Sequence, residues 1–262
     1  MLSRRAALAL GGTLSTVGLA GCASGEYQVE DRAAGRWPMA RGDSRNRATV
    51  PEATPPTSTP TLDWQRSFHA SDSPGQLVVS GDTVFAVRPL GVSALDRATG
   101  VTTWKTDGHG QTPAAGIGRV ACLAGDRLYT ADGTTVRAFD AGGELAWETA
   151  LPGVASSARA YSLVAGADML FLGLHGRLVA FGRDGTLRYS FDLPGSGDVF
   201  PGIGGGRLYA AGPGRLVGGG PGGIVDQILG QGPSISVRAE AAGRPTWPVF
   251  VGGRILVGDR SF

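Results

Sequence analysis

One block of sequence recurs along this chain at a nearly constant interval, and it constrains the fold more than any other feature. The copies lie at residues 92–104, 136–147 and 178–189, and each joins a turn to a large aromatic residue. The first two copies end in tryptophan and the third in tyrosine, with spacings of 43 and 42 residues. A repeat of this length is one supersecondary unit, which becomes stable by packing on neighbouring copies of itself.

The residues of the repeat predict four short strands in each unit. In the first copy Asp96 and Gly100 frame a turn, because an aspartate side chain bonds nearby backbone and glycine supplies a positive φ. One strand ends at Asp96, and the next carries Trp104. Two earlier apolar runs, such as 121–124 and 128–131 in the second unit, supply the first two strands. Four antiparallel strands in about 42 residues form one blade of a β-propeller.

The composition agrees with many short strands joined by turns. The chain has 262 residues, of which 44 are glycine and 16 are proline. Long helices are disfavoured, because each interior glycine costs about 1 kcal/mol relative to alanine. We therefore expect an all-β propeller over residues 61–262. The residues assigned to the structural repeat are Trp64, Asp96, Gly100, Trp104, Asp140, Trp147 and Tyr189.

The expected number of blades depends on where the repeat is strong and where it fades. Three copies are regular, whereas residues 211–236 are glycine-rich and lack the turn and the aromatic residue. Residues 62–68 resemble the fourth strand of a blade, and Trp64 precedes Trp104 by 40 residues. We expect this strand to complete the last blade of a short or incomplete ring of about four to five blades. The repeated aromatic residues are expected to wedge between successive blades.

The best copy of the repeat resembles a known family. It fits the pattern Ala-x-Asp-x-x-Thr-Gly-x-x-x-Trp at Ala94, Asp96, Thr99, Gly100 and Trp104. This pattern is similar to the repeat of the pyrroloquinoline-quinone (PQQ) dehydrogenases and of the related outer-membrane assembly lipoprotein of bacteria. The resemblance covers about residues 37–262 and implies a quinoprotein-like propeller.

The same resemblance raises the question of quinone-dependent catalysis. The dehydrogenases imply a disulfide between adjacent cysteines, a bound calcium ion and an aspartate base. This chain has only Cys22 and Cys122, which are far apart, and Cys122 is expected to be a small buried core residue. We expect no catalytic residue and no PQQ, calcium or other metal site. The alternatives are a degenerate quinoprotein dehydrogenase or its accessory, and an envelope-assembly factor.

Three histidines, His69, His109 and His175, lie in predicted loops that open on one face of a propeller. Three imidazoles on one face are a set of ligands that zinc accepts. Because these histidines belong to different blades, we expect solvated loop residues and not a metal site.

The N-terminus has the layout of an export signal. Arg4 and Arg5 precede an apolar run of about 14 residues, shorter than the roughly 20 that a membrane-spanning helix needs. The run ends in Leu-Ala-Gly-Cys, which resembles a lipobox, so we expect residues 1–21 to be removed and Cys22 to carry a lipid. The paired arginines resemble a twin-arginine signal, with the general pathway as the alternative. Residues 22–60, rich in proline and threonine near their end, are expected to form a flexible tether.

Charge excludes one class of partner. Residues 1–21 hold two of the 24 basic residues and no acid, so 22 basic and 22 acidic residues remain in the processed chain. There is no basic block of the kind that follows a phosphate backbone, and nucleic-acid binding is not expected.

We expect an exported protein, held at the outer face of the cell membrane through Cys22. It would act there as a binding or scaffolding module for an unidentified protein partner.

Overall fold

Strands that follow one another in the sequence pair into separate antiparallel sheets. The computed structural model describes residues 26–29, 36–49, 57–69, 74–88, 91–106, 120–155, 158–193, 197–212, 214–220, 234–240, 245–251 and 253–259. Within these ranges every regular element is a strand and none is a helix. It follows that the described part of the chain has no helix long and apolar enough to cross a membrane. The prediction of an all-β fold with four-stranded blades is confirmed.

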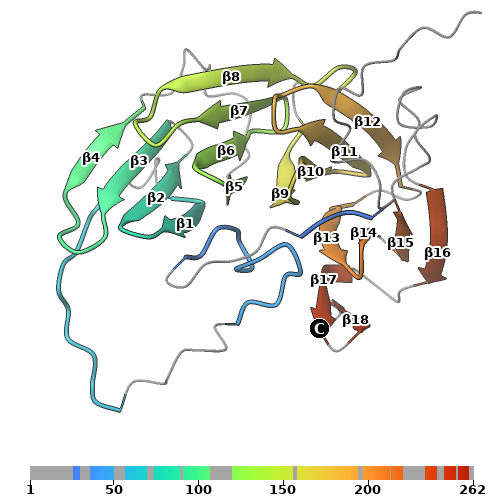
Figure 1. The fold of residues 1–262 in the computed structure, drawn as a ribbon, viewed down its shortest axis with the longest axis horizontal. Coiled ribbons are helices and arrows are strands. Elements are labelled where there is room, and N and C mark those ends of the chain that lie inside the picture. The colour runs from blue at the N-terminus through green and yellow to red at the C-terminus, as the bar shows by residue number, and fades with distance from the viewer. Residues whose placement is uncertain are drawn as a thin grey trace, which may run out of the picture.

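Four sheets have four strands and the last sheet has two, in the order of the chain (Figure 1). Blade 1 consists of β1 (Gln76–Ser80), β2 (Thr83–Arg88), β3 (Gly91–Asp96) and β4 (Thr102–Lys105). Blade 2 consists of β5 (Val120–Ala124), β6 (Arg127–Ala131), β7 (Thr135–Phe139) and β8 (Leu145–Ala150). Blade 3 consists of β9 (Ala160–Ala165), β10 (Met169–Leu174), β11 (Arg177–Gly182) and β12 (Leu187–Asp192). Blade 4 consists of β13 (Phe200–Gly204), β14 (Arg207–Gly212), β15 (Arg215–Gly220) and β16 (Ser234–Glu240). The two-stranded sheet consists of β17 (Pro245–Val251) and β18 (Arg254–Asp259).

The blades follow one another around an arc, with their first strands innermost (Figure 1). Successive first strands contact each other, from β1 to β5, β9, β13 and β17. All five residues of β5 are buried, whereas β8 at the outer edge of the same blade contains only half-buried and exposed residues. An inner strand lies between neighbouring sheets and is apolar on both faces, while an outer strand keeps one face in water.

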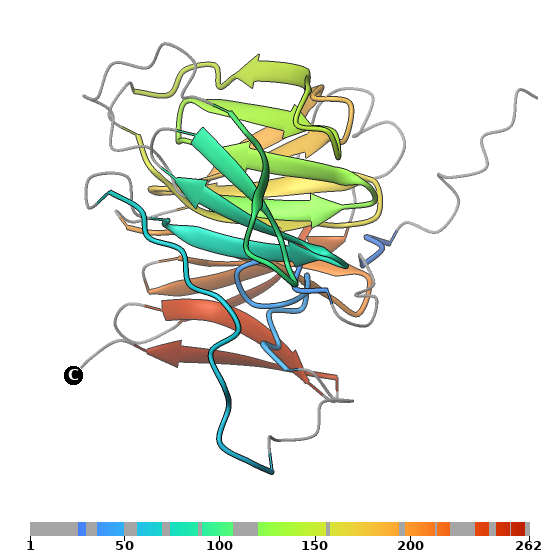
Figure 2. The same cartoon turned by 90° about the vertical axis from the view of Figure 1, so that its left-hand side faces the viewer.

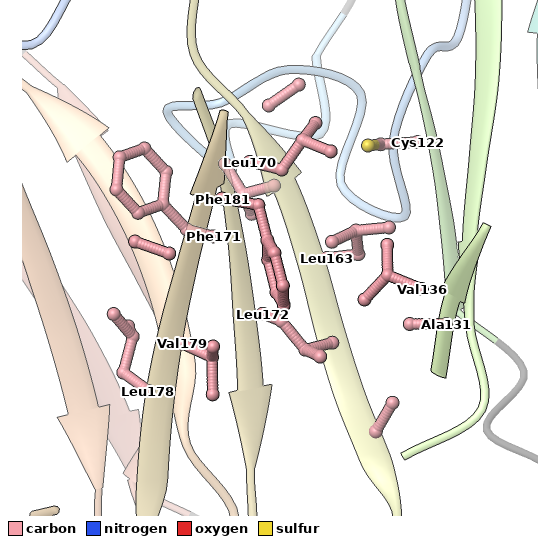
Figure 3. Packing of buried hydrophobic residues seen from close by; sticks show 14 of the residues in the cluster. Cys122, Ala131, Val136, Leu163, Leu170, Phe171, Leu172, Leu178, Val179 and Phe181 are labelled. Carbon is pink, nitrogen blue, oxygen red and sulfur yellow. The ribbon is translucent and has the colours of Figure 1, made fainter. Parts of the chain in front are cut away.

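The largest apolar core runs through blades 2, 3 and 4. Figure 3 shows Cys122 of β5, Leu163 of β9 and Phe171 of β10 within it. Cys122 is 0% exposed, as expected for a small buried residue. The interior therefore continues from one blade into the next, which is why a single blade cannot be stable alone.

The glycine-rich stretch of blade 4 still forms strands, because its small residues receive neighbouring aromatic rings. A side chain at Gly218 of β15 would overlap the ring of Tyr209 of β14, and one at Gly204 would overlap Phe250 of β17. Tyr209 and Phe250 pack on each other with ring centroids 5.1 Å apart. Glycine thus makes room here for close packing between blade 4 and the last sheet.

The prediction of a fourth strand over residues 62–68 is wrong, since no strand is formed there. The segment instead contacts the outer part of blade 1 through side chains. Trp64 donates its indole N–H to the carbonyl of Arg97 at 2.9 Å, and Arg66 donates to the hydroxyl of Thr102 at 2.8 Å. Of the features predicted for this segment, the structure retains only the contact of its tryptophan with blade 1.

Candidate functional site

The predicted repeat residues form one contact that recurs between blades. Trp104 of blade 1 donates its indole N–H to the carbonyl of Ala141 in blade 2 at 2.9 Å. Its ring lies against Gly143, where a Cβ atom would be 2.6 Å from the indole. Gly143 has a φ of +88°, so both its conformation and its missing side chain are required.

The same contact occurs on each side of this junction. Trp147 donates to the carbonyl of Arg183 at 2.9 Å and covers Gly185 of blade 3. Trp64 covers Gly100 of blade 1 in the same manner. Each of the three tryptophans is half-buried. Trp104 and Trp147 bridge from one sheet to the turn of the next, whereas Trp64 reaches the turn of blade 1 from a segment that forms no strand.

The aspartates of the repeat shape the turns that receive the tryptophans. Asp96 accepts hydrogen bonds from the backbone N–H and the hydroxyl of Thr99, at 2.8 and 2.6 Å. The hydroxyl bond, followed by the backbone bond, lowers the pKa of Asp96. Asp140 accepts from the backbone N–H groups of Gly142 and Glu144, both at 2.9 Å. These residues are structural: they place the glycine under the indole.

Tyr189 stands at the repeated aromatic position of blade 3 but has a different partner. Its hydroxyl lies 2.6 Å from the hydroxyl of Tyr27, a residue from the N-terminal part of the chain. The Tyr27 ring also meets Phe171 edge-on, with centroids 5.3 Å apart and an interplanar angle of 88°. Burial raises the pKa of both tyrosines, that of Tyr189 well above 10.

Two faces of the propeller must be distinguished. The turn face carries the turns between first and second strands, at residues 81–82, 125–126, 166–168 and 205–206, and those between third and fourth strands, at 97–101, 140–144 and 183–186. The loop face carries the turns between second and third strands, at 132–134 and 175–176, and the loop 151–159 between blades 2 and 3. Because consecutive strands of a blade are antiparallel, these two sets of connections lie at opposite ends of the sheets.

An N-terminal segment, residues 36–48, lies against the inner strands near the turn face (Figure 2). Trp37 pairs with Val79 of β1 through two backbone bonds of 2.9 Å, and the N–H of Leu123 in β5 donates to Pro38. The N–H groups of Ile203 in β13 and Phe250 in β17 donate to the carbonyls of Ser44 and Arg45, at 2.7 and 3.1 Å. The segment thus bonds the inner strands of blades 1, 2 and 4 and of the last sheet.

Polar side chains fix this segment in the interior. Asn46 is 1% exposed and donates through Nδ2 to the carbonyls of Pro201 and Pro248, both at 3.0 Å. Asp43 is buried and accepts from the guanidinium of Arg47 at 2.7 Å. Residues 36–49 therefore differ from the flexible tether expected over 22–60, because buried backbone groups of four sheets take their hydrogen bonds from them.

The loop face carries a cleft of about 500 Å³ at blade 3, beside the loop that joins this blade to blade 2. Its walls come from the loop before β9, the end of β10 and the adjoining ends of β11 and β12. The lining residues are Gly153, Val154, Ala155, Ala158, Arg159, Tyr161, Leu174, His175, Arg177 and Asp192.

The polar groups of the cleft form two pairs. In the first pair, His175 Nδ1 lies 3.8 Å from Asp198 Oδ1. Burial raises the pKa of Tyr161, and the negative charge and the hydrogen bond of Asp198 raise it further. Arg177 Nε donates to Asp192 at 2.6 Å, a bond that raises the pKa of Arg177. The cleft therefore combines an aromatic hydroxyl, an imidazole and guanidinium groups with the apolar side chains of Val154 and Leu174.

A buried ion pair supports the wall of the cleft. Arg137 of β7 contacts Asp132 at 2.7 Å and Glu148 of β8 at 2.6 Å. Burial alone would raise the pKa of Asp132, but hydrogen bonds from Arg137 and Thr134 outweigh it and lower that pKa. Asp132 is the first residue of a turn in blade 2. The backbone of Ala158, which lines the cleft, packs on Gly133 of this turn. Sequence reasoning missed this cluster because its partners lie on separate strands.

The other predicted residues are distributed as follows. His69 is exposed, and His175 is the histidine that the structure places at the cleft. His109, Arg4, Arg5 and Cys22 lie outside the described residues. Within the part of the chain that the structure describes, no three His, Cys, Asp or Glu side chains are grouped to hold a metal ion.

The blades and the comparisons with known proteins define the fold: a β-propeller whose repeats are similar to those of PQQ proteins. Residues 90–218 match the family described as outer membrane protein assembly factor BamB. No curated protein matches the sequence.

Solved structures share the fold at low sequence identity. The quinohemoprotein alcohol dehydrogenase ADHIIG from Pseudomonas putida HK5 has a TM-score of 0.60 at 13% identity, with 85% of this chain and 44% of that chain covered. A europium-containing methanol dehydrogenase has a TM-score of 0.57 at 14% identity, covering 86% and 54%. BamB from Moraxella catarrhalis has a TM-score of 0.43 at 18% identity, covering 73% and 71%. The chain spans about half the length of these dehydrogenases.

Proposed function

We propose that this protein is a non-catalytic binding module, lipid-anchored at the outer face of the cell membrane, which binds a protein partner on its loop face. The observation that carries the proposal is the asymmetry of the propeller. On the turn-face side the inner strands are bonded by the protein's own residues 36–48, whereas the loop face carries the cleft with Tyr161 and His175. Propellers commonly bind through connections held on such a rigid scaffold.

The binding role can be tested by site-specific crosslinking in native membranes. A photo-crosslinking residue at exposed Ala155, on the loop face, is expected to give a discrete protein adduct. The same residue at exposed Asp126, on the turn face, serves as the matched control and is expected to give none. Tyr161→Ala should weaken the Ala155 adduct. Equal adducts from both positions would contradict binding at the loop face.

The proposed anchor follows from the lipobox and is tested at Cys22. Cys22→Ser should leave an unprocessed precursor or release soluble protein, because the thiol that accepts the lipid is gone. The measurement is membrane fractionation with mass determination of the N-terminus. A processed Cys22→Ser chain that stays in the membrane would overturn the anchor.

The cofactor of the related dehydrogenases fits the described residues poorly. The residues near the turn-face end of the interior include Met39, Ser44 and Asn46, all at most 1% exposed, so protein atoms fill that space. At the cleft, Arg177 is already bonded to Asp192. In support of a non-catalytic role, we expect added PQQ and calcium to cause no spectral shift and no alcohol- or sugar-dependent dye reduction. Saturable turnover would instead favour a quinoprotein dehydrogenase.

The family match favours a second candidate, an envelope-assembly factor, because residues 90–218 fit the family described as outer membrane protein assembly factor BamB. The two candidates differ in the identity of the partner. If the protein crosslinked at Ala155 is a component of envelope assembly, the second candidate is favoured. If it is another protein, the more general binding role is favoured.

A further inference from the structure

We infer that the turn face of blades 3 and 4 lies against the lipid headgroups of the membrane and that the cleft points away from it. The inference rests on the lipid proposed at Cys22. It adds the orientation of the propeller and names the surface that meets the bilayer.

The chain docks on the turn face at Tyr27, close after Cys22 in the sequence. The N–H of Tyr27 donates to the carbonyl of Gly206 at 2.9 Å, in the first turn of blade 4. The N–H of Ala167, in the first turn of blade 3, donates to Gln28 at 3.0 Å, and Val29 forms a bridge with Gly166. Residues 27–29 are therefore bonded to both of these turns.

This attachment reaches into the interior of the propeller. Tyr27 is 8% exposed, its hydroxyl meets that of Tyr189, and its ring packs on Phe171. The preceding side chain, Glu26, lies against Gly206. A force on the chain at Cys22 is thus transmitted to the body of the propeller at this point.

The chain from Cys22 to Glu26 is shorter than the distance between the two faces of the propeller. Cys22 is four residues from Glu26, and four residues span at most about 14 Å even when fully extended. The six-residue strands of blade 3, which separate the turn face from the loop face, are about 20 Å long. A lipid on Cys22 therefore reaches the membrane from the turn face, and its reach is shorter than the distance to the loop face.

The turn face of blade 3 is polar where residues 27–29 are bonded to it. Exposed residues of both signs occur there, including Asp168, Asp184 and Arg188. Headgroup layers accept such a surface, whereas the hydrocarbon core does not. The turn face is accordingly expected to rest on the headgroups through the anchor, with no insertion of its own.

The orientation can be measured by fluorescence quenching in vesicles of phosphatidylethanolamine and phosphatidylglycerol that carry a headgroup quencher. The lipidated full chain is labelled at one new cysteine, Asp168→Cys on the turn face or Ala155→Cys on the loop face. Native Cys122 is 0% exposed and is shielded from the label. We expect quenching at position 168 to exceed quenching at position 155 several-fold.

A matched control lengthens the chain between Cys22 and Glu26. An insertion of about twenty glycine and serine residues gives a mean span of about 27 Å, longer than the strands. The inserted protein should remain lipidated but show similar quenching at both positions. Equal quenching in the lipidated protein without the insertion would overturn the orientation while leaving the anchor in place. Failure to find a lipid on Cys22 by mass spectrometry would overturn the anchor and the orientation together.

Discussion

The junctions among blades 1, 2 and 3 and the junction between blades 3 and 4 use the same aromatic position in different ways. At the first two junctions a tryptophan covers a glycine of the next blade and donates to a backbone carbonyl of its turn. At the third junction Tyr189 meets Tyr27, which lies 162 residues earlier in the chain. In blade 4, residues 211–236 are glycine-rich and carry no copy of the repeated turn block that ends in an aromatic residue.

This difference teaches how an irregular blade can be accommodated in a repeat protein. The first two junctions are encoded within the repeat, so each forms between neighbours in sequence. The third junction forms only when Tyr27 meets a residue far along the chain. Closing such a long loop costs conformational entropy, and folding steps of this kind tend to be slow. The contact then depends on the N-terminal residues being present and docked.

The largest effect is expected at a tryptophan junction. Trp147→Ala removes the indole that covers Gly185 and its bond to the Arg183 carbonyl, and it should lower the free energy of unfolding by about 3 kcal/mol. Thermal and denaturant unfolding measure the change. Leu145→Ala, on the same strand and 41% exposed, is the matched control and should have little effect. Equal losses in the two variants would show that the indole is not a structural wedge.

A second prediction isolates the close approach under the indole. Gly143 and Gly153 both have positive φ, but only a side chain at Gly143 would meet Trp104, while Gly153 has open space around it. Gly143→Ala should cost about 2 kcal/mol and Gly153→Ala about 1 kcal/mol, the difference being the clash. In a Trp104→Ala background the difference should disappear. If it persists there, the glycine is required for its φ alone.

A smaller effect is expected at the tyrosine junction. Tyr27→Phe leaves the buried hydroxyl of Tyr189 without its bond and should cost about 1 kcal/mol. Replacing both tyrosines by phenylalanine should recover part of this loss, since neither hydroxyl is then buried unbonded. A double variant with the full sum of the two single losses would show that the hydroxyls do not interact.

The smallest effect is a pH dependence at the same junction. Burial raises the pKa of Tyr27 and Tyr189 in the folded protein above the ordinary value of 10. Their contribution is fully present below pH 10, and it is lost as the pH rises, because the unfolded state releases these protons first. Stability should be flat toward pH 9 and decline above pH 10. The decline should be smaller in the double phenylalanine variant, and an unchanged decline would contradict the assignment.

The sequence predicts the regular part of the fold well. The spacing of Asp96, Gly100 and Trp104 predicts the turn, the outer strand and the class of repeat, because each is a local property of the chain. The strand expected at 62–68 is not formed, although Trp64 keeps its contact, since side-chain similarity does not supply a neighbouring strand.

The N-terminal docking could not be predicted in the same way. Residues 36–48 have no period of two, and their bonds are made mainly by backbone groups and by Asn46. Such contacts depend on where distant strands meet, which periodicity does not report. The cleft is also assembled from connections of two blades, so only His175 among its residues was singled out from the sequence.

The central claim is that residues 36–48 form part of the propeller and do not act as a loose tether. Amide hydrogen exchange of the intact protein tests it most directly. The N–H groups of Trp37, Val79, Leu123, Ile203 and Phe250 are the donors joining this segment to the sheets. The account predicts that all five are protected as strongly as interior blade amides. Fast exchange of Trp37, Ile203 and Phe250 beside protected blades would contradict it.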